Sequence, residues 1–270
     1  MNTSPLGTAV VTGASSGIGK IYAQRLAARG YDLILVARNK TRLDELAQEL
    51  ATGTGRTVDV LPADLGKAED VAKVAARITD DPAITLLVNN AGAGTEGPVV
   101  GADAAKIDAM VQLNVVALTR LAVAAVNAFT ARGRGTLVNI ASVVAIIPEN
   151  FLGAYAATKA YVLAFTQSLG TELKDGPVRL QAVLPGLTRT EFFDRAGLDA
   201  AALPAEMVMS AEDLVDAALA GLDQGEVYTI PSLPDPAGWA ALVAARGALG
   251  PHLSRNTPAA RYGVGEPAAA

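Results

Sequence analysis

The stretch TGASSGIG, residues 12–19, decides the fold that this sequence predicts. It joins a short apolar run, TAVVT (8–12), to a segment with helical periodicity, IGKIYAQRLAARG. Glycines in such a turn allow a positive φ and let the backbone approach a pyrophosphate closely. The helix that follows presents free N–H groups and a positive dipole end to phosphate. The spacing G-x-x-x-G-x-G differs from the standard dinucleotide fingerprint, but its place between strand and helix predicts a nucleotide-binding turn. Its residues are Gly13, Ser15, Ser16, Gly17, Ile18 and Gly19.

Short β-branched runs alternate with longer helical stretches along the rest of the chain. Most of these runs are continuously apolar, as in parallel strands that are covered on both faces. A repeated strand–helix–strand order implies right-handed crossovers. The sequence therefore predicts an α/β fold, a Rossmann-like doubly wound parallel sheet of about seven strands with helices on both faces. The expected strands are residues 8–12, 32–37, 57–62, 84–89, 136–141, 178–184 and 226–230.

The domain organisation predicted from the sequence is a single domain over residues 1–250. Residues 251–270, rich in Ala, Pro and Gly, are expected to form a mobile tail or a partner-docking arm. The segment 187–209 lies between a predicted strand and a helix that begins near Ser210. Connections of this length are uncommon unless they are functional or disordered. Because the segment is rich in apolar side chains, we expect a lid over the substrate.

The composition excludes several classes of function. The 270 residues carry a net charge of −5, which disfavours nucleic acid, and no polybasic membrane signal is present. There is no cysteine, and the single histidine, His252, stands near a proline, so no metal site is expected. The N-terminus lacks the pattern of a signal peptide. The longest apolar stretches are interrupted by Arg120 and Arg246, so we expect a cytoplasmic protein without membrane spans.

The residue at the end of the second strand indicates which nucleotide is bound. In LVARNK (35–40), Ala37 stands where an acidic residue would bind the ribose 2′-hydroxyl, and Arg38 follows. Arginine can bind a phosphate bidentately. NADP(H) is therefore favoured over NAD(H).

Several motifs, in chain order, resemble those of the classical short-chain dehydrogenase/reductase family. They are TGASSGIG, NNAG (89–92), Asn114, Ser142, Tyr155, Lys159 and PG (185–186), and the resemblance covers residues 8 to about 230. It implies a hydride transfer between NADPH and a carbonyl or alcohol, with Asn114, Ser142, Tyr155 and Lys159 as catalytic residues. It also implies cofactor contacts from Tyr155, Lys159 and a further set: Asp64, Leu65, Asn90, Ala91, Gly92, Pro185, Gly186, Thr188 and Thr190.

The resemblance gives Tyr155 the role of general acid and Lys159 the role of its neighbouring cation. Residues four apart leave the same face of a helix. A free phenol has a pKa of about 10, and we expect the lysine to lower it. Ser142 would orient the substrate oxygen, and Asn114 would hold a water that links Lys159 to solvent.

The expected substrate contacts are mostly apolar. They come from Ala93 to Glu96, Val143 to Ile147, Leu152 and the segment 187–209. The named contacts are Ser142, Val144, Leu152, Tyr155 and Phe192. A neutral, hydrophobic ketone, aldehyde or alcohol is therefore favoured over an acyl-carrier thioester or a sugar phosphate.

Two alternatives to this enzyme remain open. A non-catalytic NADP(H)-binding redox sensor or scaffold would not need the Ser/Tyr/Lys/Asn set, and another Rossmann enzyme such as a methyltransferase would not need Arg38.

The end of the chain, GEVYTIPSLPDPAGW, departs from the Asp-Gly-Gly of many family members. A homodimer or homotetramer is expected, without a choice between them.

Overall fold

A computed structural model describes residues 4–94, 97–150, 153–192 and 204–264 of the chain. The chain divides into two units, Met1–Pro231 and Ser232–Ala270. The boundary lies before residue 250, where the sequence predicts the domain to end, because the last sheet strand is already complete at Thr229.

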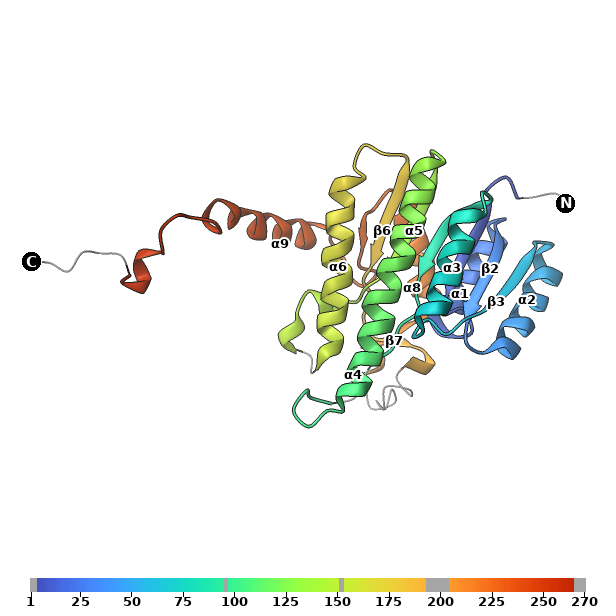
Figure 1. The fold of residues 1–270 in the computed structure, drawn as a ribbon, viewed down its shortest axis with the longest axis horizontal. Coiled ribbons are helices and arrows are strands. Elements are labelled where there is room, and N and C mark those ends of the chain that lie inside the picture. The colour runs from blue at the N-terminus through green and yellow to red at the C-terminus, as the bar shows by residue number, and fades with distance from the viewer. Residues whose placement is uncertain (1–3, 95–96, 151–152, 193–203, 265–270) are drawn as a thin grey trace, which may run out of the picture. The chain divides into compact units, whose positions relative to one another are not determined.

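Seven parallel strands form the sheet of the first unit, in the order β3-β2-β1-β4-β5-β6-β9 (Figure 1). The order reverses between β1 and β4, which is where doubly wound sheets open a crevice at the carboxyl ends of their strands. The predicted fold class is therefore confirmed. The strands are β1 (Thr8–Thr12), β2 (Asp32–Ala37), β3 (Val58–Pro62), β4 (Ile84–Asn89), β5 (Gly135–Ile140), β6 (Val178–Val183) and β9 (Tyr228–Thr229).

Helices cover both faces of this sheet (Figure 1). Successive residues of each strand point to opposite faces, so Ala9 and Val11 join one buried cluster while Val10 joins the other. The first cluster packs against α1 (Gly17–Ala28), α2 (Lys40–Thr54) and α8 (Ala211–Asp223). The second packs against α3 (Ala68–Asp80), α5 (Leu118–Ala131) and α6 (Ala154–Glu172).

One long helical stretch interrupts its α-helical pattern beside the crevice. α4 (Ala104–Val111) passes into a π-helical segment, η1 (Gln112–Ala117), which passes into α5. By length and composition alone this stretch, Ala104–Ala131, is apolar enough to cross a membrane, which the sequence analysis did not expect. Core helices of water-soluble domains can have the same length and composition. In this structure α5 buries Leu121, Ala125 and Phe129 against the sheet.

Shorter elements follow the carboxyl ends of β5 and β6. After β5 come η2 (Val143–Ala145) and η3 (Pro148–Asn150). After β6 come β7 (Thr188–Arg189), η5 (Ala205–Met207) and β8 (Met209–Ser210), and β7 pairs in parallel with β8. The Ser210 hydroxyl caps α8 by accepting a hydrogen bond from the backbone N–H of Asp213 at 3.0 Å, so the helix begins where the sequence predicts it. The middle of the expected lid, residues 193–203, lies outside the described residues.

The second unit contains α9 (Ala237–Ala248), η6 (Gly250–His252) and η7 (Ala260–Tyr262). None of its described residues, 232–264, is buried. Its helix is apolar on several sides, with Trp239, Leu242 and Val243 among many alanines.

Candidate active site

The glycine turn between β1 and α1 leaves no room for side chains. Gly13 and Gly17 have φ angles of +67° and +53°, which other residues rarely adopt. A Cβ on Gly19 would lie 2.5 Å from the Asn90 amide nitrogen and would also meet the Gly13 carbonyl. The turn is thus held close to the backbone behind it, and its open side faces the crevice.

Asn90 and Thr12 tie this turn to the loop after β4. The Asn90 amide donates to the Thr12 carbonyl at 2.8 Å, and the Thr12 hydroxyl accepts from the backbone N–H groups of Asn90 and Ala91 at 2.9 and 3.0 Å. The NNAG motif therefore fixes the glycine turn. Asn89, at the end of β4, connects this loop to the next strand of the sheet. Its side-chain amide donates a hydrogen bond to the Asn139 side chain of β5 at 3.2 Å.

Ser142, Tyr155 and Lys159 meet at the carboxyl end of β5. Lys159 is 6% exposed, and its ammonium donates to the Ile140 carbonyl at 2.8 Å. The same nitrogen lies 5.8 Å from the centre of the Tyr155 ring. The Ser142 side chain is hydrogen-bonded to Tyr155 and donates to the Pro185 carbonyl at 3.3 Å. The half-buried phenol thus forms one cluster with the buried hydroxyl and ammonium.

The structure does not show the predicted lowering of the Tyr155 pKa by Lys159. Burial raises the pKa of Tyr155 above its ordinary value of 10.0, and the hydrogen bond with Ser142 acts in the opposite, lowering direction. The lysine is bonded to Ile140 and not to the phenol, and burial lowers its own pKa from 10.5 to about 8. Tyr155 therefore keeps its proton at neutral pH, as a general acid must.

Asn114 is held in the π-helical segment and faces both the NNAG loop and α6. Its side chain accepts from the Ala93 N–H at 2.9 Å and donates to the Ala93 carbonyl at 2.8 Å and to the Thr158 hydroxyl at 3.0 Å. These bonds occupy both N–H groups of the amide, so the side chain connects two elements. The water expected beside it stays a prediction.

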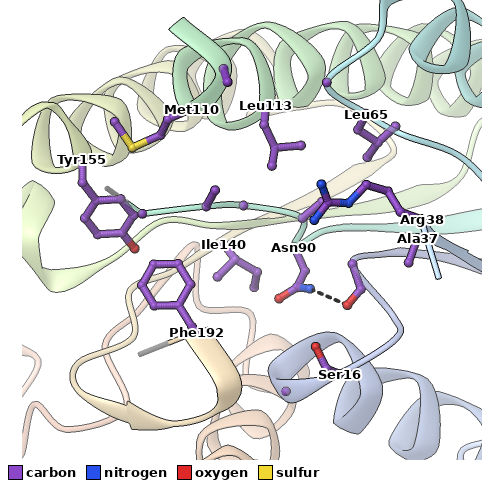
Figure 2. Close-up of a pocket in the computed structure, with 18 of the residues that line it drawn as sticks. Ser16, Ala37, Arg38, Leu65, Asn90, Met110, Leu113, Ile140, Tyr155 and Phe192 are labelled. Atoms are coloured by element: carbon purple, nitrogen blue, oxygen red, sulfur yellow. Dashed lines mark hydrogen bonds between the residues drawn. The ribbon is translucent and has the colours of Figure 1, made fainter. Parts of the chain in front are cut away.

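A cavity of about 1340 Å³ runs along the crevice and joins these parts. Figure 2 shows Tyr155, Met110 and Phe192 together at one end and Arg38 at the other, with Asn90 between them. The predicted residues that line the cavity are Gly13, Ser15, Ser16, Gly17, Ile18, Arg38, Asp64, Leu65, Asn90, Ala91, Gly92, Ser142, Tyr155, Lys159, Pro185, Thr188, Thr190 and Phe192.

Four predicted site residues do not line it. Gly19 lies beneath the turn, Asn114 is 2% exposed behind the NNAG loop, and Val144 is 7% exposed. The Gly186 carbonyl accepts a hydrogen bond from the Thr188 hydroxyl at 3.0 Å, and Gly186 does not line the cavity. Leu152 lies outside the described residues.

Sequence reasoning missed several lining residues. Arg42 stands four residues after Arg38, in the first turn of α2, a position that could have indicated it, and Glu191 follows Thr190. Met110 and Leu113 come from the long apolar stretch around Asn114, where nothing distinguishes them from core residues.

The residues present fit a dinucleotide cofactor. A Cβ on Gly13 or Gly19 would clash with Asn90 or the Gly13 carbonyl behind the turn, so the glycines let the turn sit back and leave its open side to a ligand. The Lys159 ammonium has three N–H groups, and the Ile140 carbonyl takes one of them, which leaves donors for hydroxyl groups of a ribose.

A family model described as short chain dehydrogenase matches residues 7–200. A very-long-chain 3-oxoacyl-CoA reductase from Anas platyrhynchos is 33% identical over 187 residues, which are 68% of this chain and 60% of the relative. The chain thus spans about 60% of the length of that relative. An uncharacterised oxidoreductase from Staphylococcus epidermidis is 32% identical over 199 residues, 71% of this chain and 85% of the relative.

Solved structures resemble this chain along most of its length. A short-chain dehydrogenase from Sphingobium yanoikuyae, in complex with NADPH, is 47% identical with a TM-score of 0.91, covering 95% of this chain and 100% of that one. A bulky-bulky ketone specific alcohol dehydrogenase from Comamonas testosteroni is 44% identical with a TM-score of 0.87, covering 95% and 98%.

Proposed function

The chain belongs to the short-chain dehydrogenase/reductase family, and from this premise we propose that it reduces neutral ketones with bulky groups on both sides of the carbonyl, using NADPH. The observation that carries the proposal is the cluster of Ser142, Tyr155 and Lys159 at the apolar end of a cavity large enough for a dinucleotide and a substrate.

Support for NADPH comes from the residues after β2. Arg38 lines the cavity, and no Asp or Glu lies between Asp32 and Asp44 in the sequence. Among the described residues, Arg38 has no ion-pair partner that would occupy its guanidinium. The relative from Sphingobium yanoikuyae, with 47% identity, was solved in complex with NADPH.

The chemistry of the chain is a proton transfer beside a bound cofactor. When bound, NADPH supplies the hydride. The Tyr155 hydroxyl donates its proton to the carbonyl oxygen, and Ser142 donates a hydrogen bond that orients this oxygen. The Lys159 ammonium stabilises the phenolate that remains on Tyr155, since a cation near a phenol favours its charged form. Burial keeps water away from these groups and strengthens their interactions.

The substrate end of the cavity supports a hydrophobic ketone. The Phe192 ring lies 5.6 Å from the Tyr155 ring, at an interplanar angle of 48°. Met110 lies on the other side of Tyr155, and Ile140 lines the cavity between Tyr155 and Asn90 (Figure 2). These side chains offer contact area without charge, which suits two apolar substituents on one carbonyl carbon. The alcohol dehydrogenase from Comamonas testosteroni is specific for bulky-bulky ketones by its description.

Acyl-CoA reduction is the second candidate, because the relative from Anas platyrhynchos carries that name. It is the weaker one, since the side chains beside Tyr155, Phe192 and Met110, are apolar, and Lys106, one helical turn before Met110 in α4, is the cation of this part of the described lining that could meet a phosphate of coenzyme A. A non-catalytic sensor is not favoured, because the relatives are described as dehydrogenases, reductases or oxidoreductases.

Steady-state oxidation of NADPH by the purified protein tests the substrate. The panel contains an aryl ketone with two bulky substituents, a small methyl ketone, a 3-oxoacyl-CoA and an aldehyde, each with NADPH and with NADH. We expect the highest kcat/KM for the bulky ketone with NADPH. A preference for the 3-oxoacyl-CoA would overturn the proposed substrate class, and turnover of none of the four would favour the non-catalytic alternative.

The proposed assembly is a homodimer or homotetramer. It is supported by α9, a helix of 12 residues with Trp239, Leu242 and Val243 and without a buried residue. An isolated helix of this length is marginal in water, and a helix that is apolar on all sides is normally covered. Light scattering after size exclusion would give the mass, and a monomer would contradict the proposal.

A further inference from the structure

An ion pair at the rim of the cavity joins two segments that are far apart in the sequence. Arg42 is the third residue of α2, and Glu191 follows β7 by two residues. The Arg42 Nη1 atom lies 3.1 Å from Oε1 and 2.9 Å from Oε2 of Glu191. Both residues line the cavity, and each side chain is 46% exposed. The pair is therefore open to exchange with a ligand.

Arg42 belongs to the end of the cavity that would hold the adenosine ribose. It lies four residues after Arg38, which precedes α2, and both line the cavity. The Asn39 side chain, which also lines it, accepts from the Arg42 N–H at 3.1 Å and thereby caps α2. Arg38 and Arg42 thus form a basic pair where a 2′-phosphate is expected after the second strand.

Glu191 stands on the segment that connects this end to the catalytic cluster. Thr190 faces the glycine turn, because a Cβ on Gly17 would lie 3.2 Å from the Thr190 Cβ. Phe192 packs against Tyr155. The carboxylate of Glu191 therefore reaches toward the adenosine end from a backbone position near the middle of the cavity.

We propose that Glu191 weakens the preference for NADP(H) over NAD(H), because its carboxylate competes with the 2′-phosphate of NADP(H) for Arg42. This inference rests on the proposed NADP(H)-dependent function. The Nη1 atom of Arg42 makes both contacts to Glu191, so a phosphate that binds this nitrogen must displace the carboxylate, and a phosphate carries more charge than a carboxylate. NADPH therefore displaces Glu191 from Arg42, and NADH, which lacks this phosphate, leaves the pair intact.

The test is the dissociation constant of each reduced cofactor, measured by isothermal titration calorimetry without substrate. In Glu191→Gln, we expect NADPH to bind about two- to fivefold more tightly, the range that an exposed ion pair can supply. The affinity for NADH should stay unchanged. The gain should vanish in the double variant Arg42→Gln/Glu191→Gln relative to Arg42→Gln, because the contested guanidinium is gone.

Asp44→Asn is the matched control. It removes one negative charge from the same helix, but Asp44 pairs with Lys40 at 2.6 Å and neither residue lines the cavity. The control should bind NADPH as the parent does. The inference would be overturned if Glu191→Gln left the NADPH affinity unchanged, or if the affinities for NADPH and NADH changed equally. The proposed cofactor would still stand in both cases if the parent prefers NADPH. A parent without that preference would overturn the proposed cofactor as well.

Discussion

Lys159 shows how a single residue of the site affects the stability of the fold. Its ammonium is buried at the carboxyl end of β5, and burial lowers its pKa from 10.5 to about 8. Below about pH 8 both the folded and the unfolded chain carry the proton, so the folded state bears the full desolvation penalty. Between pH 8 and 10.5 the folded chain releases the proton first, and its stability rises with pH.

Replacing this cation by an apolar side chain should therefore stabilise the fold. At pH 7 we expect Lys159→Met to raise the free energy of unfolding by roughly 2 kcal/mol, since the relief of desolvation exceeds the loss of one hydrogen bond to Ile140. The advantage should shrink at about pH 9.5. Urea denaturation at both pH values measures it.

The control for that prediction is Lys73→Met on the exposed side of α3. Its effect on stability should not depend on pH in this window. If Lys159→Met destabilises the protein at neutral pH, or if its advantage grows with pH, then burial of the ammonium does not oppose folding.

The catalytic residues could be predicted because their types and order in the sequence resemble a family, but their bonding could not. The structure places Tyr155 and Ser142 in contact, yet it directs Lys159 to Ile140 and the Asn114 side chain to Ala93 and Thr158. A spacing of four residues gives a shared helix face and no more than that. Which backbone carbonyl meets an ammonium depends on the packing of other elements.

At the scale of elements, the glycine turn depends on close contact between β1, α1 and the loop after β4. We expect Gly19→Ala to destabilise the fold by about 1–3 kcal/mol, as overpacking usually does, and to weaken NADPH binding, because its Cβ would displace Gly13 or Asn90. Thermal unfolding and a cofactor titration measure the two effects.

Gly53→Ala is the matched control within the same layer. Gly53 lies in α2, and a Cβ placed there meets nothing within 4 Å. It should be neutral or stabilising by up to about 1 kcal/mol, because alanine favours a helix over glycine. Equal effects of the two substitutions would mean that the turn tolerates a side chain and is not held by close contact.

The strands and most helices could be predicted at this scale because apolar runs and helical periodicity are local properties of the sequence. The π-helical segment Gln112–Ala117 could not, since it depends on Asn114 finding partners on two other elements. The pairing of β7 with β8 was missed for a similar reason. Each strand has two residues and no pattern of its own.

The whole molecule divides at Pro231, and both buried clusters lie within the first unit. A chain that ends at Pro231 should therefore keep its cooperative unfolding. At a concentration at which light scattering shows the parent as a monomer, we expect its Tm to shift by less than about 4 °C, the change that about 1 kcal/mol produces in a chain of this size. Circular dichroism on heating measures it. A larger loss under this condition would mean that residues 232–270 stabilise the first unit within one chain, apart from the contacts between copies proposed for α9.

The central claim is that ketone reduction by this molecule requires the proton on the Tyr155 hydroxyl. The most direct measurement compares single-turnover oxidation of bound NADPH by a bulky ketone in the parent and in Tyr155→Phe, with the NADPH dissociation constant determined for both. We expect the variant to bind NADPH nearly as the parent does and to react about 10²–10⁴-fold more slowly, the usual contribution of a general acid. A rate within tenfold of the parent, at unchanged NADPH affinity, would contradict the claim.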